Sequence, residues 1–201
     1  FLVSLAVYPA LPEEVAIHWN IQGNPDGYGS KFTGAFALPL ATFVLYLLLL
    51  FVPLVDPRRD NYPHFIKAYR LLKLGFVLFM LILHLLTLAF NLGYNIDIGR
   101  FVTLCLGLLF TLMGIGLPRI TPNYFVGIRT PWTLASGSVW TQTHHFGGKL
   151  FFWSGLLVII SIFLPGQPRF WLMMALLFGS SLTTAVYSYL IFRKEENAKK
   201  E

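Results

Sequence analysis

The sequence has one cysteine, few charged residues and none of the short motifs that mark common metal or hydrolytic sites. Cys105 has no second cysteine to pair with, so no disulfide can form within the chain. Charged residues are 12% of the chain, well below the roughly 25% of soluble domains, which argues against a soluble fold. No Cys pair, His-Glu-x-x-His or Gly-x-Ser-x-Gly pattern is present. We therefore predict a protein that is not an enzyme and that holds no metal or cofactor.

Long hydrophobic runs dominate what is present. Hydrophobic residues are 56% of the chain, the mean hydropathy is +0.65, and the charges lie in the gaps between apolar runs. This pattern is typical of a polytopic membrane protein. Complete spans are predicted at residues 32–55, 74–90, 101–117, 150–164 and 170–192.

The first apolar stretch, Phe1 to Tyr8, is too short to cross a bilayer core of about 30 Å. We interpret it as the end of a first span whose beginning is absent, with the remnant of a signal peptide as the alternative. The predicted fold class is an all-α polytopic membrane protein. It is a six-transmembrane-helix bundle, with its first span only partly present, a small extracytoplasmic cap and a structured cytoplasmic loop.

Four segments follow from this pattern. Residues 1–31 hold the end of the first span and the cap, and 32–117 hold spans two to four with a basic cytoplasmic loop at 56–73. Residues 118–149 form a long loop, and 150–201 hold spans five and six with a charged tail. In the cap, Val15, Ile17 and Trp19 alternate with other residues as in a strand, and Asn24 to Gly27 has turn chemistry. Gly107 and Gly114 share a helix face and predict close packing.

The distribution of Lys and Arg predicts the orientation. Twelve of the fifteen lie in residues 56–73, in or beside the long loop, or in the tail, whereas Lys31, Arg100 and Arg169 lie on the other side. The side rich in Lys and Arg is cytoplasmic in most membrane proteins. The sequence therefore predicts cytoplasmic termini and an extracytoplasmic cap, and the resemblance described below implies a location in the bacterial inner membrane.

The long loop has the features of a folded segment. Thr130 before Pro131 is a helix start, and Ser138 is a potential cap for a second helix that runs through Trp140 into the fifth span. Arg129 beside the first helix start suggests an anion site, such as a lipid phosphate or a partner's carboxylate. The alternative is that Arg129 snorkels and the Trp residues anchor the membrane interface. His144 and His145 are adjacent and cannot chelate one metal together.

His84 is the one ionisable residue deep within a predicted span, and Thr87 and Asn91 extend it into a polar stripe. Ionisable groups inside membranes often mark functional sites. A neutral, hydrogen-bonded structural histidine is the alternative. If the stripe is functional, the protein would be a small transporter or a lipid-handling membrane protein.

Two segments resemble known sequences. The run from Gly127 to Leu134, with Val139-Trp140, Thr143-His144 and Gly147-Gly148, is similar to the SdpI family of bacterial immunity proteins. Leu11 to Val15, with His18-Trp19-Asn20, Gly23, Pro25-Asp26 and Ser30-Lys31, resembles the N-terminal domain often fused to that family. With the order of the spans, the resemblance covers nearly the whole chain.

The resemblance implies protection against a secreted, membrane-active toxin peptide, and signalling in which a cytoplasmic transcriptional repressor is held at the membrane. Membrane lipids are further expected partners, and direct nucleic-acid binding is not expected. The expected toxin contacts in the cap are His18, Trp19, Asn20, Pro25, Asp26 and Lys31. The expected docking or switch residues of the loop are Asn123, Gly127, Arg129, Thr130, Pro131, Trp132, Thr133, Trp140, Thr143 and His144.

Overall fold

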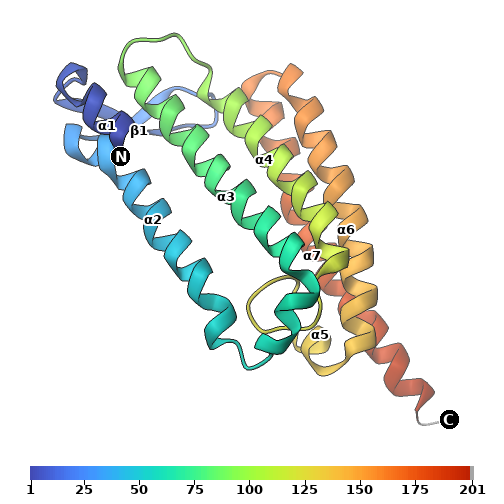
Figure 1. The fold of residues 1–201 in the computed structure, drawn as a ribbon. Helices are drawn as coiled ribbons and strands as arrows, with labels where there is room; N and C mark the ends of the chain where they lie inside the picture. Colours follow the sequence, from blue (N-terminus) through green and yellow to red (C-terminus); the bar gives the residue numbers. More distant parts are fainter. Residues whose placement is uncertain (200–201) are drawn as a thin grey trace.

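The computed structural model describes residues 1–199 and confirms an all-α polytopic membrane fold (Figure 1). In this part of the chain five helices are long and apolar enough to cross a membrane. They are α2 (Lys31–Val55), α3 (Tyr62–Asn91), α4 (Ile98–Gly116), α6 (Gly137–Ile160) and α7 (Gly166–Ala198). The predicted partial first span corresponds to α1 (Leu2–Val7), a helix of 6 residues.

The cap is an ordered hairpin, as the alternation predicted. Strand β1 (Glu14–Trp19) pairs antiparallel with β2 (Pro25–Ser30), and Trp19 lies opposite Pro25. The predicted turn was misplaced, because Pro25 to Gly27 belong to β2. The Asn20 side chain instead accepts hydrogen bonds from the backbone N–H groups of Gln22 and Asn24, each at 3.0 Å, and so closes the reversal. Gly23, with φ +88°, supplies the left-handed residue.

The hairpin is fixed to the ends of α2 and α3. The Asn91 side chain accepts from the Ala16 N–H at 2.7 Å and donates to its carbonyl at 2.9 Å, as a neighbouring strand would. Trp19 packs edge-on against Phe90 with ring centroids 5.3 Å apart. We call this the hairpin end of the bundle.

Two of the predicted boundaries between loops and spans were wrong, because helices continue past the apolar runs. Helix α3 begins at Tyr62, so it includes residues 62–73 of the predicted basic loop as well as the span. Its backbone angles are non-helical only at Phe65. The predicted turn at Pro165 to Pro168 is the start of α7, which also includes most of the charged tail. Charged residues at a helix end lie in water or among head groups, so hydropathy does not mark where the helix stops.

Helices α4 and α6 approach closely, as Gly107 and Gly114 predicted. A Cβ atom on Gly107 would lie 2.9 Å from the carbonyl oxygen of Gly155, and one on Gly114 would overlap the backbone of α6. Phe110 and Phe151 stack between the two helices with centroids 4.8 Å apart. This pair of helices is the framework that holds the loop between them.

Between α4 and α6, the chain forms η3 (Leu117–Arg119), an irregular segment and α5 (Pro131–Ala135). Helix α6 then runs without a break from Gly137, so about half of the predicted loop is helical. Its N-cap is Ser136, whose Oγ accepts from the Val139 N–H, and not Ser138 as predicted. The segment around α5 lies at the opposite end of the bundle from the hairpin (Figure 1), and we call this the loop end.

Candidate functional site

A buried asparagine folds the irregular segment at the loop end. Asn123 is fully buried, and its Nδ2 donates to the carbonyl oxygens of Thr121 and Val126, both at 2.9 Å. Its Oδ1 accepts from the N–H groups of Phe125 at 2.9 Å and Val126 at 2.6 Å. One side chain therefore satisfies four backbone groups that no regular element could pair.

His144 connects this segment to α6. Its Nε2 lies 3.0 Å from the backbone N of Ile128, and its Nδ1 lies 2.8 Å from the carbonyl oxygen of Trp140. A backbone N–H can only donate, so Nε2 is the acceptor, and the proton lies on Nδ1 of a neutral ring. Gly127 has φ +107°, and a Cβ there would overlap Nε2. Glycine is thus required both for the backbone angle and for the approach of the imidazole.

Trp140 is the largest fully buried side chain of this region. Its indole Nε1 donates to the Ile120 carbonyl at 2.7 Å, and its ring stacks on His144 with centroids 4.1 Å apart. Both residues lie in α6, one turn apart. The helix therefore presents a rigid aromatic and polar face around which residues 120–128 are wrapped.

Helix α5 begins as predicted, with Thr130 and Thr133 in a reciprocal capping box and Pro131 in its first turn. Thr133 Oγ1 also donates to the Ile128 carbonyl at 2.9 Å. The hydroxyl groups of Thr130 and Ser188 lie 2.9 Å apart, which joins the loop to α7. Ser136 Oγ makes a second connection by donating to Glu195 at 2.9 Å.

The predicted docking residues divide into buried and exposed groups. Arg129 and Pro131 are exposed, and Trp132 is half-buried with its ring centroid 5.0 Å from that of Tyr189. Thr130, Gly127 and the rest are partly or fully buried and hold the loop together. The buried members are Asn123, Thr133, Trp140, Thr143 and His144. Of the predicted docking residues, Arg129, Pro131 and Trp132 are therefore the ones that a partner could contact without opening the loop.

The predicted anion site at Arg129 finds no added support. Its Nη1 donates to the Tyr124 carbonyl at 2.9 Å, so the guanidinium closes the loop. The exposed amide expected beside it, that of Thr133, is taken by Thr130 Oγ1 at 3.2 Å. Anion binding here remains a prediction.

A second candidate site lies at the hairpin end. A pocket of about 540 Å³ opens between the hairpin and the adjoining ends of α4 and α7. We call it the hairpin pocket. It is lined by His18, Trp19, Asn20, Ile21, Asp26, Ile98, Gly99, Val102, Thr103, Gly166, Arg169, Phe170 and Met173. At its rim the His18 Nδ1 and Asp26 Oδ1 atoms are 2.5 Å apart.

Arg169 also lines this pocket, and the sequence had not indicated a binding role for it. Only 4% of its surface is exposed, and the one hydrogen bond of its guanidinium among the described residues joins Nη2 to Asp97 Oδ1 at 3.4 Å. Trp19 lines the same pocket, and its indole Nε1 is buried without a partner among residues 1–199. The guanidinium of Arg169 is thus held away from bulk water with a single long contact, which favours an anionic or acceptor-rich ligand.

Comparison with known protein families gives one match in the C-terminal half of the chain and one at its N-terminus. Residues 119–188 match the SdpI/YfhL protein family. We call these residues the SdpI/YfhL segment. Residues 1–43 match the DUF1648 domain of unknown function. Over 195 residues the chain is 28% identical to "Immunity protein SdpI" of Bacillus subtilis (strain 168), covering 96% of this chain and 91% of that protein. No solved structure matches.

The SdpI/YfhL segment is anchored to the rest of the bundle by Asp56, which the sequence analysis had placed only in a basic loop. Asp56 is 2% exposed, and its Oδ2 accepts from the Tyr62 hydroxyl and from the Tyr124 N–H, both at 3.0 Å. Its Oδ1 accepts from the Arg58 N–H at 2.7 Å. An acidic residue beside five Lys and Arg residues was a sign of a structural role. Its partner could not be predicted, because Tyr124 is remote in sequence.

The remaining predicted residues of the cap do not all reach the hairpin pocket. Pro25 lies in the sheet opposite Trp19, behind the lining. Lys31 lies at the far end of the hairpin, where its Nζ is 3.5 Å from Glu13 and 5.2 Å from the ring centroid of Tyr8. Of the predicted toxin contacts, His18, Trp19, Asn20 and Asp26 line the hairpin pocket, together with Arg169.

The polar stripe outside the SdpI/YfhL segment is hydrogen-bonded in part within the protein. His84 Nε2 lies 2.8 Å from Ser4 Oγ, which fixes α1, whereas its Nδ1 has no partner among residues 1–199. Thr87 donates to the Leu83 carbonyl, and Asn91 holds the hairpin. These contacts favour the structural interpretation over a transport route. Among residues 1–199, no three His, Cys, Asp or Glu side chains are placed to hold a metal ion.

Proposed function

We propose that this protein is a membrane immunity protein that protects a bacterial cell against a secreted, membrane-active toxin peptide. The observation that carries the proposal is the 28% identity to Immunity protein SdpI over 96% of the chain, a length that includes both the hairpin and the loop. A match confined to the bundle would have supported only a shared membrane fold.

The hairpin pocket is the toxin-contact site in this proposal. The excess of Lys and Arg at the loop end favours a cytoplasmic loop and an extracytoplasmic hairpin. A peptide arriving from outside would then meet the pocket first. Arg169 offers donors for a carboxylate or for peptide carbonyl groups, while Trp19, Phe170 and Met173 offer apolar contact.

The loop end is the signalling side in this proposal, and its exposed residues Arg129, Pro131 and Trp132 form the docking surface for a cytoplasmic repressor. Helix α7 joins the two sides, because it carries Arg169 at the hairpin pocket and Ser188 and Glu195 at the loop. Such coupling requires two arrangements of α7. If toxin-exposed cells recruit the repressor equally with Arg129→Lys and with the parent, the docking surface is elsewhere.

Survival of a sensitive strain tests the proposal. Cells expressing this chain should survive the toxin against which the Bacillus subtilis relative protects at least about tenfold better than cells with empty vector. The relative itself is the positive control. Survival equal to the vector, at membrane abundance equal to that of the relative, would contradict the proposal.

A further inference from the structure

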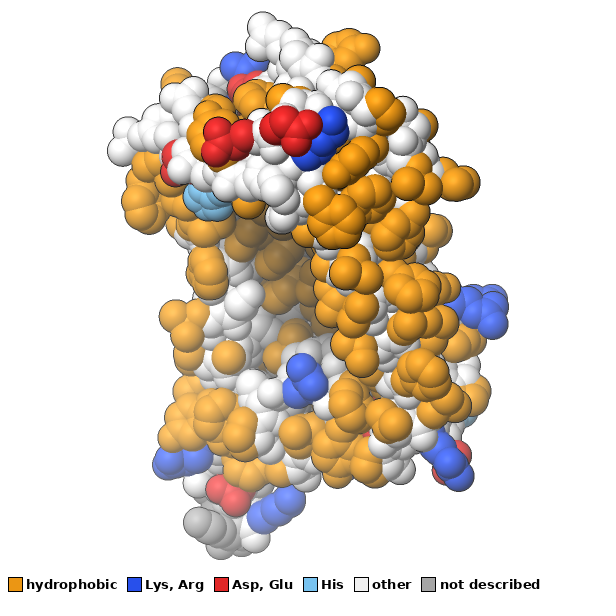
Figure 2. Space-filling view, turned by 90° about the vertical axis from the view of Figure 1, so that its left-hand side faces the viewer, with side chains coloured by type: hydrophobic (Ala, Val, Ile, Leu, Met, Phe, Trp, Pro, Cys, Tyr) orange, Lys and Arg blue, Asp and Glu red, His pale blue; other side chains and the backbone are white. Residues whose placement is uncertain are grey.

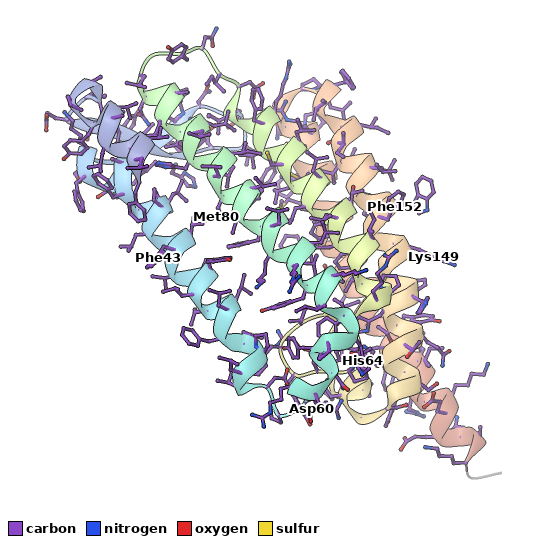
Figure 3. All side chains as sticks on the ribbon, in the orientation of Figure 1. Phe43, Asp60, His64, Met80, Lys149 and Phe152 are labelled. Atoms are coloured by element: carbon purple, nitrogen blue, oxygen red, sulfur yellow. The ribbon has the colours of Figure 1, made fainter. Side chains whose placement is uncertain are left out.

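Helices α2 and α3 are joined at their ends and diverge between them. Towards the loop end the Tyr69 hydroxyl of α3 donates to the Leu49 carbonyl of α2, and towards the hairpin end Leu88 of α3 and Ala35 of α2 belong to one buried hydrophobic cluster. Between these ties lies a groove of about 680 Å³. Figure 2 shows this face hollowed between two columns of hydrophobic side chains. Phe43 of α2 and Met80 of α3 line it and are labelled in Figure 3.

The groove is apolar over most of its length and opens sideways from the bundle. Pro39, Val77 and Leu81 join Phe43 and Met80 in its lining. Phe43 is 52% exposed, and few residues of α2 are buried. In a bilayer a lateral opening of this kind faces hydrocarbon, so acyl chains and not water are its natural contents.

One end of the groove is positively charged. Arg70 and Lys73, one turn apart on α3, line it together, and no Asp or Glu does. Neither cation forms an ion pair within residues 1–199. The Lys73 ammonium is positioned 4.9 Å from the ring centroid of Tyr69 and 5.9 Å from that of Tyr46. The two charges are therefore held at the mouth of an apolar channel without a counterion from this part of the protein.

We propose that this groove is a binding site for a phospholipid with an anionic head group, whose phosphate is held by Arg70 and Lys73. A rise of about 1.5 Å per residue places Arg70 and His84 about 21 Å apart along α3. This exceeds the roughly 15 Å that one leaflet contributes to a bilayer core of about 30 Å. The groove thus accommodates an acyl chain along Val77 and Met80 while the phosphate stays at the cationic end. Basic residues at this depth attract anionic lipids.

Lipid binding to the purified full-length chain tests this site. The chain is held in zwitterionic detergent micelles, and bound phosphatidylglycerol or phosphatidylcholine is counted by native mass spectrometry during titration. We expect phosphatidylglycerol to bind at one saturable site and phosphatidylcholine to bind much more weakly. Arg70→Gln and Lys73→Gln should each weaken phosphatidylglycerol binding about fivefold, because each cation near a membrane surface contributes about 1 kcal/mol.

Two further variants complete the design. Lys67→Gln removes one charge from an exposed position on the same helix that does not line the groove, and it should change the affinity less than about twofold. Met80→Trp keeps both cations but fills the channel, and it should abolish the saturable site. Equal binding of the two lipids, equal losses in Lys67→Gln and Lys73→Gln, or unchanged binding in Met80→Trp would each overturn the proposal.

Discussion

Gly127→Ala is expected to lower the free energy of unfolding by about 2–6 kcal/mol, from two costs of about 1–3 kcal/mol each. Residue 127 has φ +107°, where an alanine is strained. The new Cβ would also overlap Nε2 of His144, which accepts the Ile128 N–H. The imidazole and the loop must then separate, and the buried N–H of Ile128 loses its acceptor. In detergent, the midpoint of thermal unfolding should fall by about 4 °C or more.

Gly137→Ala is the matched control. Gly137 is the first residue of α6 and is exposed, and no atom lies within 4 Å of the place that a Cβ on this residue would occupy. Alanine there should be neutral or stabilising by up to about 1 kcal/mol. If both variants unfold at the temperature of the parent, the contact between Gly127 and His144 does not hold the loop.

Arg169→Gln is expected to abolish most protection in the survival assay while leaving the protein folded and abundant. Arg169 is 4% exposed and lines the hairpin pocket, where its guanidinium has one long contact to Asp97 and can otherwise bind a ligand. A charge-assisted hydrogen bond to a ligand contributes roughly 1.5–3 kcal/mol, so affinity for the toxin should fall at least about tenfold. Glutamine keeps a donor for Asp97 and limits the structural cost.

Arg100→Gln is the control for this prediction. Arg100 Nε lies 3.0 Å from the other oxygen of Asp97, but its side chain is exposed and does not line the pocket. The variant removes one cation from the same carboxylate and should protect like the parent. Loss of protection in both variants, or in neither, would contradict a specific role for Arg169 in ligand contact.

The features that the sequence predicted well depend on neighbouring residues. The helix start at Thr130 and Pro131 requires only the hydroxyl of one residue and the ring of the next. The strand through Val15 and Ile17 follows from alternation. Gly107 and Gly114 share a face because of helical periodicity alone, and that face meets α6.

The features that it missed depend on contacts between distant residues. Asp56 accepts from the N–H of Tyr124, 68 positions away, and Arg169 meets Asp97, 72 positions away. Composition shows that these charged residues exist but not which end of which helix they face. His144 was predicted only as a docking or switch residue of the loop. It is buried because the wrapped segment supplies the N–H of Ile128, a contact that no periodicity reveals.

In the proposed mechanism, one chain presents a ligand pocket outside the membrane and a docking surface inside it. Thiol labelling of intact cells distinguishes this arrangement from its inverse. Asn24→Cys in the hairpin and Ser138→Cys at the start of α6 place a thiol at exposed positions, in a background where the buried Cys105 is replaced by alanine. An impermeant reagent should label position 24 on intact cells and position 138 only after lysis. Labelling of position 138 on intact cells, with position 24 reached only after lysis, would overturn the proposed mechanism.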